Sequence, residues 1–335
     1  MGKKRIEIMD TTLRDGEQTS GVSFSISEKL TITQLLLEEL RVDRVEVASA
    51  RVSEGEFASV KAIMDWANTQ GHTDRIEVLS FVDQGVSIDW MAKAGVKVQN
   101  LLTKGSLNHL KHQLKKTPEQ HFAEIADIFK LAAKHGISSN VYLEDWSNGM
   151  RNSPDYVFQY LDFLSGQPVK RILLPDTLGV LTPSETFDYI SQIKLRYPNL
   201  HFDFHAHNDY DLANANILEA IRAGADGLHL TVNGMGERAG NACVEEIAAA
   251  MKISSGINCG IHLSQIQELC RFVAQASSKP IHPSKPIVGE MVCRHESGIH
   301  CRSLLKDELA YQPFLSTEIG KSTEMVIGRH SGGRT

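Results

Sequence analysis

The sequence has no long hydrophobic run, and none of its apolar stretches approaches the roughly 18–20 residues that a membrane-spanning helix needs. The N-terminus lacks the apolar core of a secretion signal. There is no excess of positive charge, since 35 Lys and Arg stand against 41 Asp and Glu, and the scattered basic residues argue against a nucleic-acid partner. The five cysteines form no Cys-x-x-Cys pair, so we expect reduced thiols in a cytoplasmic protein without a membrane partner.

What the sequence does contain is a regular alternation of short apolar segments and amphipathic stretches from residue 5 to about residue 256. Proline follows Thr117, Ser153 and Thr182, as it does at helix starts. We predict strands at 5–12, 43–49, 75–82, 96–103, 138–145, 170–176, 201–207 and 227–233. We predict helices near 27–40, 53–70, 86–94, 117–135, 153–165, 182–196, 211–223 and 241–255.

Eight strand–helix units in 335 residues predict an α/β fold, a (β/α)8 TIM barrel. A doubly wound open sheet is the alternative, but it normally has a glycine-rich turn after its first strand, and residues 12–16 are not one. The alternation stops near residue 257, and a connector with Pro280, Pro283 and Pro286 follows. We therefore predict a catalytic barrel over 1–256 and a small C-terminal accessory subdomain over 257–335.

Two histidines at the end of the seventh predicted strand are the first functional signal. His205 and His207 are two residues apart, so their side chains point to the same side of a strand, as two imidazoles binding one divalent ion would. Asp10, at the end of the first strand, is a third candidate ligand, because a closed barrel makes the first and last strands neighbours. Histidines within strands are also often core residues with satisfied hydrogen bonds, so the pair is a weak signal by itself.

Polar residues also follow other predicted strands, which is where TIM barrels place their chemistry. They comprise Arg14, Asp15 and Gln18 after the first strand, Glu46 in the second, Tyr142 and Glu144 in the fifth, Asp176 and Thr177 in the sixth, and Asn233, Glu237, Arg238 and Asn241 after the eighth. This clustering at one end of the strands supports the barrel.

Three segments carry a family resemblance. Residues 10–18 (DTTLRDGEQ), 205–209 (HAHND) and 233–241 (NGMGERAGN) resemble the signatures of the DRE-TIM metallolyase superfamily, in its Claisen-condensing branch. That branch contains the 2-isopropylmalate, homocitrate and citramalate synthases. The resemblance implies an acyltransferase that condenses acetyl-CoA with an α-keto acid and then hydrolyses the thioester.

The resemblance implies a role for individual residues. Asp10, His205, His207 and Asn241 would hold one divalent ion, Mn²⁺, Mg²⁺ or Zn²⁺, although Asn241 could instead cap a helix. Arg14 would bind the keto oxygen, with a salt bridge to Glu46 as the alternative, and Glu144 would be the base or would orient it. Thr177 would hold the substrate carboxylate, with a turn cap as the alternative. Asp15 and Gln18 would support the substrate, and His300 and Tyr311 would assist deprotonation at a barrel mouth.

The choice of keto acid is less specific than the reaction. Residues 142–149 (YLEDWSNG) resemble citramalate synthases, and a wall of Leu79, Leu102 and Tyr142 favours pyruvate, although all three could be ordinary core residues. Residues 295–300 (HESGIH) instead resemble homocitrate synthases, and 2-ketoglutarate and 2-ketoisovalerate remain alternatives. The family usually has an acidic residue where this chain has Arg302, which bears on the role of His300. The resemblance further implies a homodimer, and we expect no regulatory domain within the sequence.

Two other classes remain open. One is the carbon–carbon cleavage of the hydroxymethylglutaryl-CoA lyase branch, whose glycine-rich loop with a catalytic cysteine is not found in this sequence. The other is a non-catalytic relative that binds metabolites.

Overall fold

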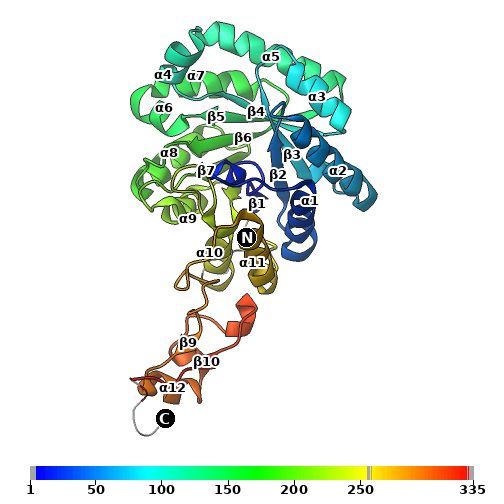
Figure 1. Cartoon of the computed structure of the whole chain (residues 1–335). Coiled ribbons are helices and arrows are strands. Elements are labelled where there is room, and N and C mark those ends of the chain that lie inside the picture. The colour runs from blue at the N-terminus through cyan, green and yellow to red at the C-terminus, as the bar shows by residue number, and fades with distance from the viewer. Residues whose placement is uncertain (1–4, 255–256, 258, 330, 332–335) are drawn as a thin grey trace.

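The computed structural model describes residues 5–254, 257, 259–329 and 331. Eight parallel strands close into a barrel in which each strand pairs with the next and β8 pairs with β1, which confirms the predicted (β/α)8 fold (Figure 1). The strands are β1 (Glu7–Asp10), β2 (Arg44–Ser49), β3 (Ile76–Phe81), β4 (Val98–Lys104), β5 (Ser138–Glu144), β6 (Val169–Asp176), β7 (Phe202–Ala206) and β8 (Gly227–Leu230).

Helices alternate with the strands and surround the barrel. They are α1 (Ile26–Gln34), α2 (Glu54–Gln70), α3 (Val86–Ala94), α5 (Pro118–Lys134), α7 (Pro154–Ser165), α8 (Pro183–Arg196), α9 (Ala213–Ala223) and α10 (Val244–Ala249). The short helices α4 (Leu107–His109) and α6 (Trp146–Asn152) follow β4 and β5 and were not predicted. Thr117 and Thr182 cap α5 and α8 through their side chains, as proline at the next position indicated.

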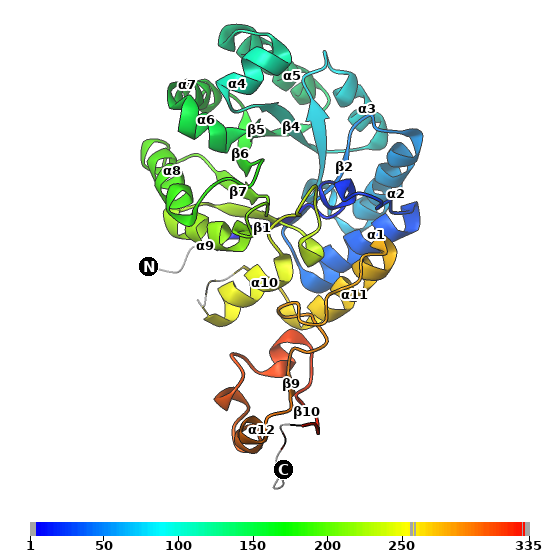
Figure 2. The ribbon, with the colours of Figure 1, turned by 60° about the vertical axis from the view of Figure 1, so that its left-hand side comes forward.

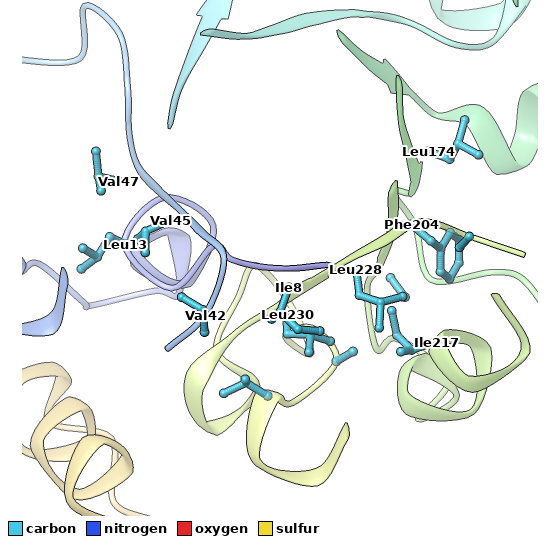
Figure 3. Packing of buried hydrophobic residues seen from close by; sticks show 14 of the residues in the cluster. Ile8, Leu13, Val42, Val45, Val47, Leu174, Phe204, Ile217, Leu228 and Leu230 are labelled. Atoms are coloured by element: carbon cyan, nitrogen blue, oxygen red, sulfur yellow. The ribbon is translucent and has the colours of Figure 1, made fainter. Parts of the chain in front are cut away.

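Side chains alternate along each strand between the helices and the barrel interior. Ile8, Phe204 and Leu228 belong to the large apolar cluster in which the strands meet the helices (Figure 3). Their neighbours Met9, His205 and His229 lie on the opposite face. Met9 therefore joins a separate interior cluster with Leu79, Tyr142 and Leu173. This alternation decides which residues can meet inside the barrel.

A buried ionic layer lies in the barrel interior. Arg44 is 3% exposed, and its guanidinium lies 2.6 Å from Asp203 Oδ2 and 3.1 Å from Glu77 Oε1. Both carboxylates are fully buried. Asn140 Nδ2 also donates to Glu77 at 3.2 Å. Arg44 compensates the charges of both carboxylates. Without it, two unpaired buried charges would destabilise the fold.

The elements packed on the barrel continue beyond the predicted domain boundary at residue 257. Helix α11 (Ile266–Ser277) packs against α1, and Asn233 Nδ2 donates to the Cys270 carbonyl at 2.9 Å, so α11 lies on the barrel. Lys285 in the connector lies 3.1 Å from Glu245 Oε1 and 2.9 Å from Glu246 Oε1, which ties the connector to α10. The unit beyond contains β9 (Arg294–His295), α12 (Gly298–Leu304) and β10 (Glu324–Met325).

This C-terminal unit extends away from the barrel in both views (Figures 1 and 2). All five cysteines are free thiols. In the part of the chain that the structure describes, no helix combines the length and apolar character needed to cross a bilayer.

The ionic layer generates a stability prediction. Replacing Arg44 with Met leaves Asp203 and Glu77 without their cation, so we expect the free energy of unfolding to fall by about 3–5 kcal/mol. Urea unfolding followed by circular dichroism measures this. The control is Lys61→Ala, which removes an ion pair with Asp65 on the surface of α2 and should cost less than about 1 kcal/mol. Equal losses of unfolding free energy in the two variants would show that the buried ionic layer stabilises the fold no more than a surface ion pair does.

Candidate functional site

A cavity of about 170 Å³ opens at the carboxyl ends of the strands. Its lining joins residues that are far apart in the sequence: Arg14, Asp15, Gln18, Leu79, Leu102, Tyr142, Glu144, Pro175, Thr177, His205, His207 and Glu237. Ten of these twelve carry a role predicted from the sequence, and only Pro175 and Glu237 do not. The barrel therefore gathers most of the predicted site into one place.

Two imidazoles and one carboxylate form the most concentrated group in the cavity. His205 lies on β7, and His207 follows that strand and pairs through its backbone with Asn241. The Nε2 atoms of the two histidines are 3.3 Å apart. Asp15 Oδ2 lies 3.1 Å from His205 Nε2 and 3.6 Å from His207 Nε2. All three side chains are buried.

The charges at this group favour a cation. Burial lowers the pKa of His205 below its ordinary value and that of His207 to about 4, which favours neutral rings that can offer a lone pair. Burial alone would raise the pKa of Asp15, but Arg14 and the imidazoles outweigh it and hold that pKa well below its ordinary range. Asp15 Oδ2 and Asn241 Oδ1 are buried without a hydrogen-bond donor in the described chain. This donor set fits a divalent ion.

The carboxylate at the imidazoles is that of Asp15, where the sequence led us to expect Asp10. Asp10 pairs in register with Leu230, and the alternation turns it to the same side as Ile8, away from the interior face that carries His205. Its two oxygens accept hydrogen bonds from Thr12 N at 2.8 Å and Thr12 Oγ1 at 3.0 Å. Burial raises the pKa of Asp10 to about 7. Asp15 reaches the site because the chain turns back after β1.

Asn241 does not act as a helix cap, which was the alternative from the sequence. Helix α10 begins at Val244, and its N-cap is Cys243. The Asn241 side chain instead donates through Nδ2 to the Met235 carbonyl at 3.2 Å. Its Oδ1 atom is left buried without a donor, and its backbone pairs with that of His207.

Arg14 is held beside this group by several partners. Its Nε donates to Glu46 Oε2 at 2.6 Å, so the predicted salt bridge is present. One terminal nitrogen donates to Tyr142 Oη at 3.1 Å, and the other lies 3.4 Å from Asp15 Oδ2. The guanidinium therefore cannot swing away, and it places a fixed positive charge on the cavity wall.

Three polar residues line the other side of the cavity. Thr177 Oγ1 accepts a hydrogen bond from Asp145 N at 2.9 Å, which leaves its hydroxyl hydrogen available to a ligand. Glu144 forms an ion pair with Lys104. Glu237 is mainly exposed, and its nearest cation is Arg238 at 3.5 Å.

The apolar part of the wall comes from three adjacent strands. Leu79, Leu102 and Tyr142 lie on β3, β4 and β5, and all three belong to the interior cluster around Met9. Leu79 and Tyr142 are buried, and all three line the cavity. The two readings from the sequence are thus compatible, because these side chains are core residues that also face the cavity.

His300 and Tyr311 do not line this cavity. Their rings stack on each other with centroids 4.0 Å apart. His300 belongs to α12, which lies away from the barrel in Figure 1. Within one chain, the C-terminal unit does not bring either residue to the barrel mouth.

His229 is a buried neighbour of the site to which the sequence analysis assigned no role. Its Nδ1 atom lies 3.0 Å from Tyr142 Oη, and its ring meets that of His205 edge to face. Its position as the penultimate residue of β8, between two leucines, could have indicated an inward-facing polar residue. Glu237 lies in a quoted motif but on a loop, and no periodic pattern predicts its direction.

Comparison with family models divides the chain at the connector. Residues 5–273 match the family described as HMGL-like, and residues 287–335 match the homocitrate synthase post-HMGL domain-like family. The first match covers β1 through most of α11, as the packing does.

Individual relatives are similar over almost the whole chain. 2-Isopropylmalate synthase 2 of Caldanaerobacter subterraneus is 35% identical over 338 residues, which cover 98% of this chain and 83% of that protein. The (R)-citramalate synthase of Methanocaldococcus jannaschii is 36% identical over 330 residues, with 98% and 65% covered. Among solved structures, the HMG-CoA lyase of Bacillus subtilis is 18% identical with a TM-score of 0.69, and 84% of this chain and 97% of that chain are covered. This last likeness concerns the fold.

Proposed function

This chain belongs to the HMGL-like family, and we propose that it condenses acetyl-CoA with an α-keto acid and then hydrolyses the thioester. The observation that carries the proposal is the gathering of Arg14, Asp15, His205 and His207 around one small cavity. Relatives that are similar over 98% of the chain are named for such synthases. We assign the chain to the Claisen-condensing branch on these grounds.

We propose that Asp15, His205 and His207 hold one divalent ion, with Asn241 as a fourth ligand. The support is the short spacing of the first three donor atoms and the buried, unpaired oxygen of Asn241. Such an ion, Mn²⁺, Mg²⁺ or Zn²⁺, would supply Lewis acidity toward the keto acid. Asp15 thus takes the role that the sequence analysis gave to Asp10.

The protein's own groups then act on the two substrates. Arg14, fixed by Glu46 and Tyr142, would stabilise the negative charge that develops on the keto oxygen. The Thr177 hydroxyl would donate to the keto acid's carboxylate. Glu144 would accept the proton of the acetyl methyl group or orient its acceptor, with Gln18 supporting the substrate. The methyl carbon bonds to the keto carbon, and water then cleaves the thioester and releases the CoA thiol.

We propose pyruvate as the preferred keto acid, which gives citramalate. Tyr142 and the two leucines bound a cavity of about 170 Å³, which suits a methyl group better than an isopropyl or carboxyethyl group. A rigid wall rejects a larger group by steric clash, whereas a smaller group loses only about 1–3 kcal/mol per missing methylene. Because a relative is named 2-isopropylmalate synthase, 2-ketoisovalerate is the second keto acid to test.

We further propose that the working form is a homodimer. Large apolar side chains are exposed on the C-terminal unit, including Ile299 (72%), Leu305 (74%) and Ile327 (90%). Surfaces of this kind mark interfaces. His300 lies away from the cavity of its own chain, so a second copy of the chain is the partner at whose barrel mouth His300 and Tyr311 would act.

The activity proposal predicts thiol release from acetyl-CoA in the presence of a keto acid and Mn²⁺. We expect the highest kcat/KM with pyruvate, followed by 2-ketoisovalerate and 2-ketoglutarate, because the wall is closed to longer side chains. A thiol-reactive dye measures the release. If 2-ketoglutarate is preferred by about tenfold, the wall argument fails. If no keto acid releases thiol, the condensation itself is contradicted.

The metal assignment predicts different effects for two aspartates. We expect Asp15→Asn to weaken Mn²⁺ binding by more than about 100-fold, since it removes a charged ligand. Asp10→Asn is the matched control, because its Oδ1 can still accept from Thr12 N, and it should weaken binding by less than about tenfold. Isothermal titration calorimetry of metal-free protein gives both affinities without turnover. The reverse order would restore Asp10 as the ligand.

The dimer proposal predicts that charge on the exposed apolar surface separates the copies. We expect the double variant Ile299→Asp, Leu305→Asp to sediment as a monomer while the unchanged protein sediments as a dimer. Leu195→Asp is the control, because Leu195 is 86% exposed on α8 of the barrel and should leave the dimer intact. Analytical ultracentrifugation distinguishes the species. A dimer that survives the double substitution would place the interface elsewhere.

A further inference from the structure

Tyr142 is a wall residue whose hydroxyl group is unusually well fixed. Its ring lines the cavity, and its Oη atom has three polar neighbours in the barrel interior. An Arg14 nitrogen donates to it at 3.1 Å, Glu46 Oε2 lies at 3.2 Å and His229 Nδ1 lies at 3.0 Å. The direction of the ring is therefore set from behind the cavity.

His229 is itself held by a buried carboxylate. Its Nε2 atom lies 3.1 Å from Asp203 Oδ2, and both residues are almost fully buried. Asp203 also accepts from Arg44 at 2.6 Å, and this ion pair keeps the carboxylate ionised. The hydrogen of His229 then lies on Nε2 toward Asp203, which leaves Nδ1 to accept the single hydrogen of the Tyr142 hydroxyl together with Glu46 Oε2.

Ring packing fixes the same unit in the remaining directions. The Tyr142 and His229 ring centroids are 5.5 Å apart with an interplanar angle of 80°. Tyr142 also meets His205 at 6.2 Å and 90°. An edge-to-face arrangement on two sides resists tilting of the phenol ring.

We propose that His229 is a positioning residue that, supported by Asp203, holds Tyr142 as a rigid wall and so limits the length of the keto acid's side chain. This rests on the proposed condensation and adds a determinant of its substrate range. A wall can exclude a larger side chain only if it does not yield, because the extra methylenes would otherwise gain contacts in the cavity. The rigidity of the Tyr142 ring, and not its size alone, then determines which keto acid the cavity accepts.

Two substitutions of His229 separate its two contacts. In His229→Gln, the amide nitrogen can still donate to Asp203, but nothing stands at the place of Nδ1 to accept from Tyr142. In His229→Asn, the amide oxygen lies near the place of Nδ1 and can accept from Tyr142, while the contact with Asp203 is lost. The control is His201→Asn, because His201 Nε2 lies 2.8 Å from Asp203 Oδ1 but does not contact Tyr142.

The measurement is kcat and KM for pyruvate and for 2-ketoisovalerate. In His229→Gln we expect the preference for pyruvate to fall about tenfold or more, mainly through a lower KM for 2-ketoisovalerate. His229→Asn should recover part of the preference, and His201→Asn should keep it. An unchanged preference in His229→Gln, or an equal loss in His201→Asn, would overturn the proposal.

Tyr142→Phe provides a second route if His229→Gln fails to fold, since it removes only the hydroxyl. We expect at least the same loss of preference, because the contacts with Arg14 and Glu46 are lost as well. Adding His229→Gln to Tyr142→Phe should then cost no more than Tyr142→Phe alone, because the interaction between the two residues is already absent. Additive losses, or a wild-type preference in Tyr142→Phe, would contradict the inference.

Failure of the condensation itself can be recognised separately. If the unchanged protein releases no thiol with any keto acid, the proposed function fails, and the positioning of Tyr142 is decided by ¹⁵N NMR of the His229 ring. We expect a protonated Nε2 and a hydrogen-bonded, unprotonated Nδ1, and Tyr142→Phe should shift only the Nδ1 resonance. Identical Nδ1 shifts in the two proteins would overturn the positioning role.

Discussion

The crowding of three electron-pair donors at Asp15, His205 and His207 is the constraint on which the site depends. Two imidazole nitrogens 3.3 Å apart with a carboxylate oxygen against both form a site that a cation would stabilise. Arg14 provides part of the positive charge within the protein. The surrounding architecture serves this arrangement. Barrel closure brings β1 and β7 to either side of β8, and the turn after β1 carries Asp15 back over the mouth.

The connection between site and surface runs through the loop after β8. Its residues include Glu237 in the cavity wall and Asn241 beside His207, and α10 begins directly after it. Arg238 in this loop pairs with Asp209 at 2.8 Å and so joins the loops after β7 and β8. Lys285 binds the two glutamates at the start of α10. The connector to the C-terminal unit is thus anchored on the element that also positions the proposed fourth ligand.

Much of this could be predicted from the sequence, because the signals were periodic. Alternating strands and capped helices indicated the barrel, and barrel geometry then indicated which strand ends would meet. Barrel closure makes the first and last strands neighbours, which favours Asp10 as the carboxylate ligand, but alternation from Ile8 places Asp10 on the helix-facing side. Asp15 lies on a turn, where no period predicts direction. The position of His300 relative to the cavity depends on the path of the connector. The connector has no periodic pattern, so the sequence does not predict that path.

The division of labour around the barrel explains how one reaction can accept different keto acids. The proposed metal ligands and Arg14 come from β1, β7 and β8 and their loops, whereas the apolar wall comes from β3, β4 and β5. A change in the wall therefore alters the space for a side chain without moving a ligand. The two halves meet at Tyr142, which touches Arg14 on one side and His229 on the other. A substitution of Tyr142 therefore touches both halves, whereas Leu79 and Leu102 belong to the apolar wall.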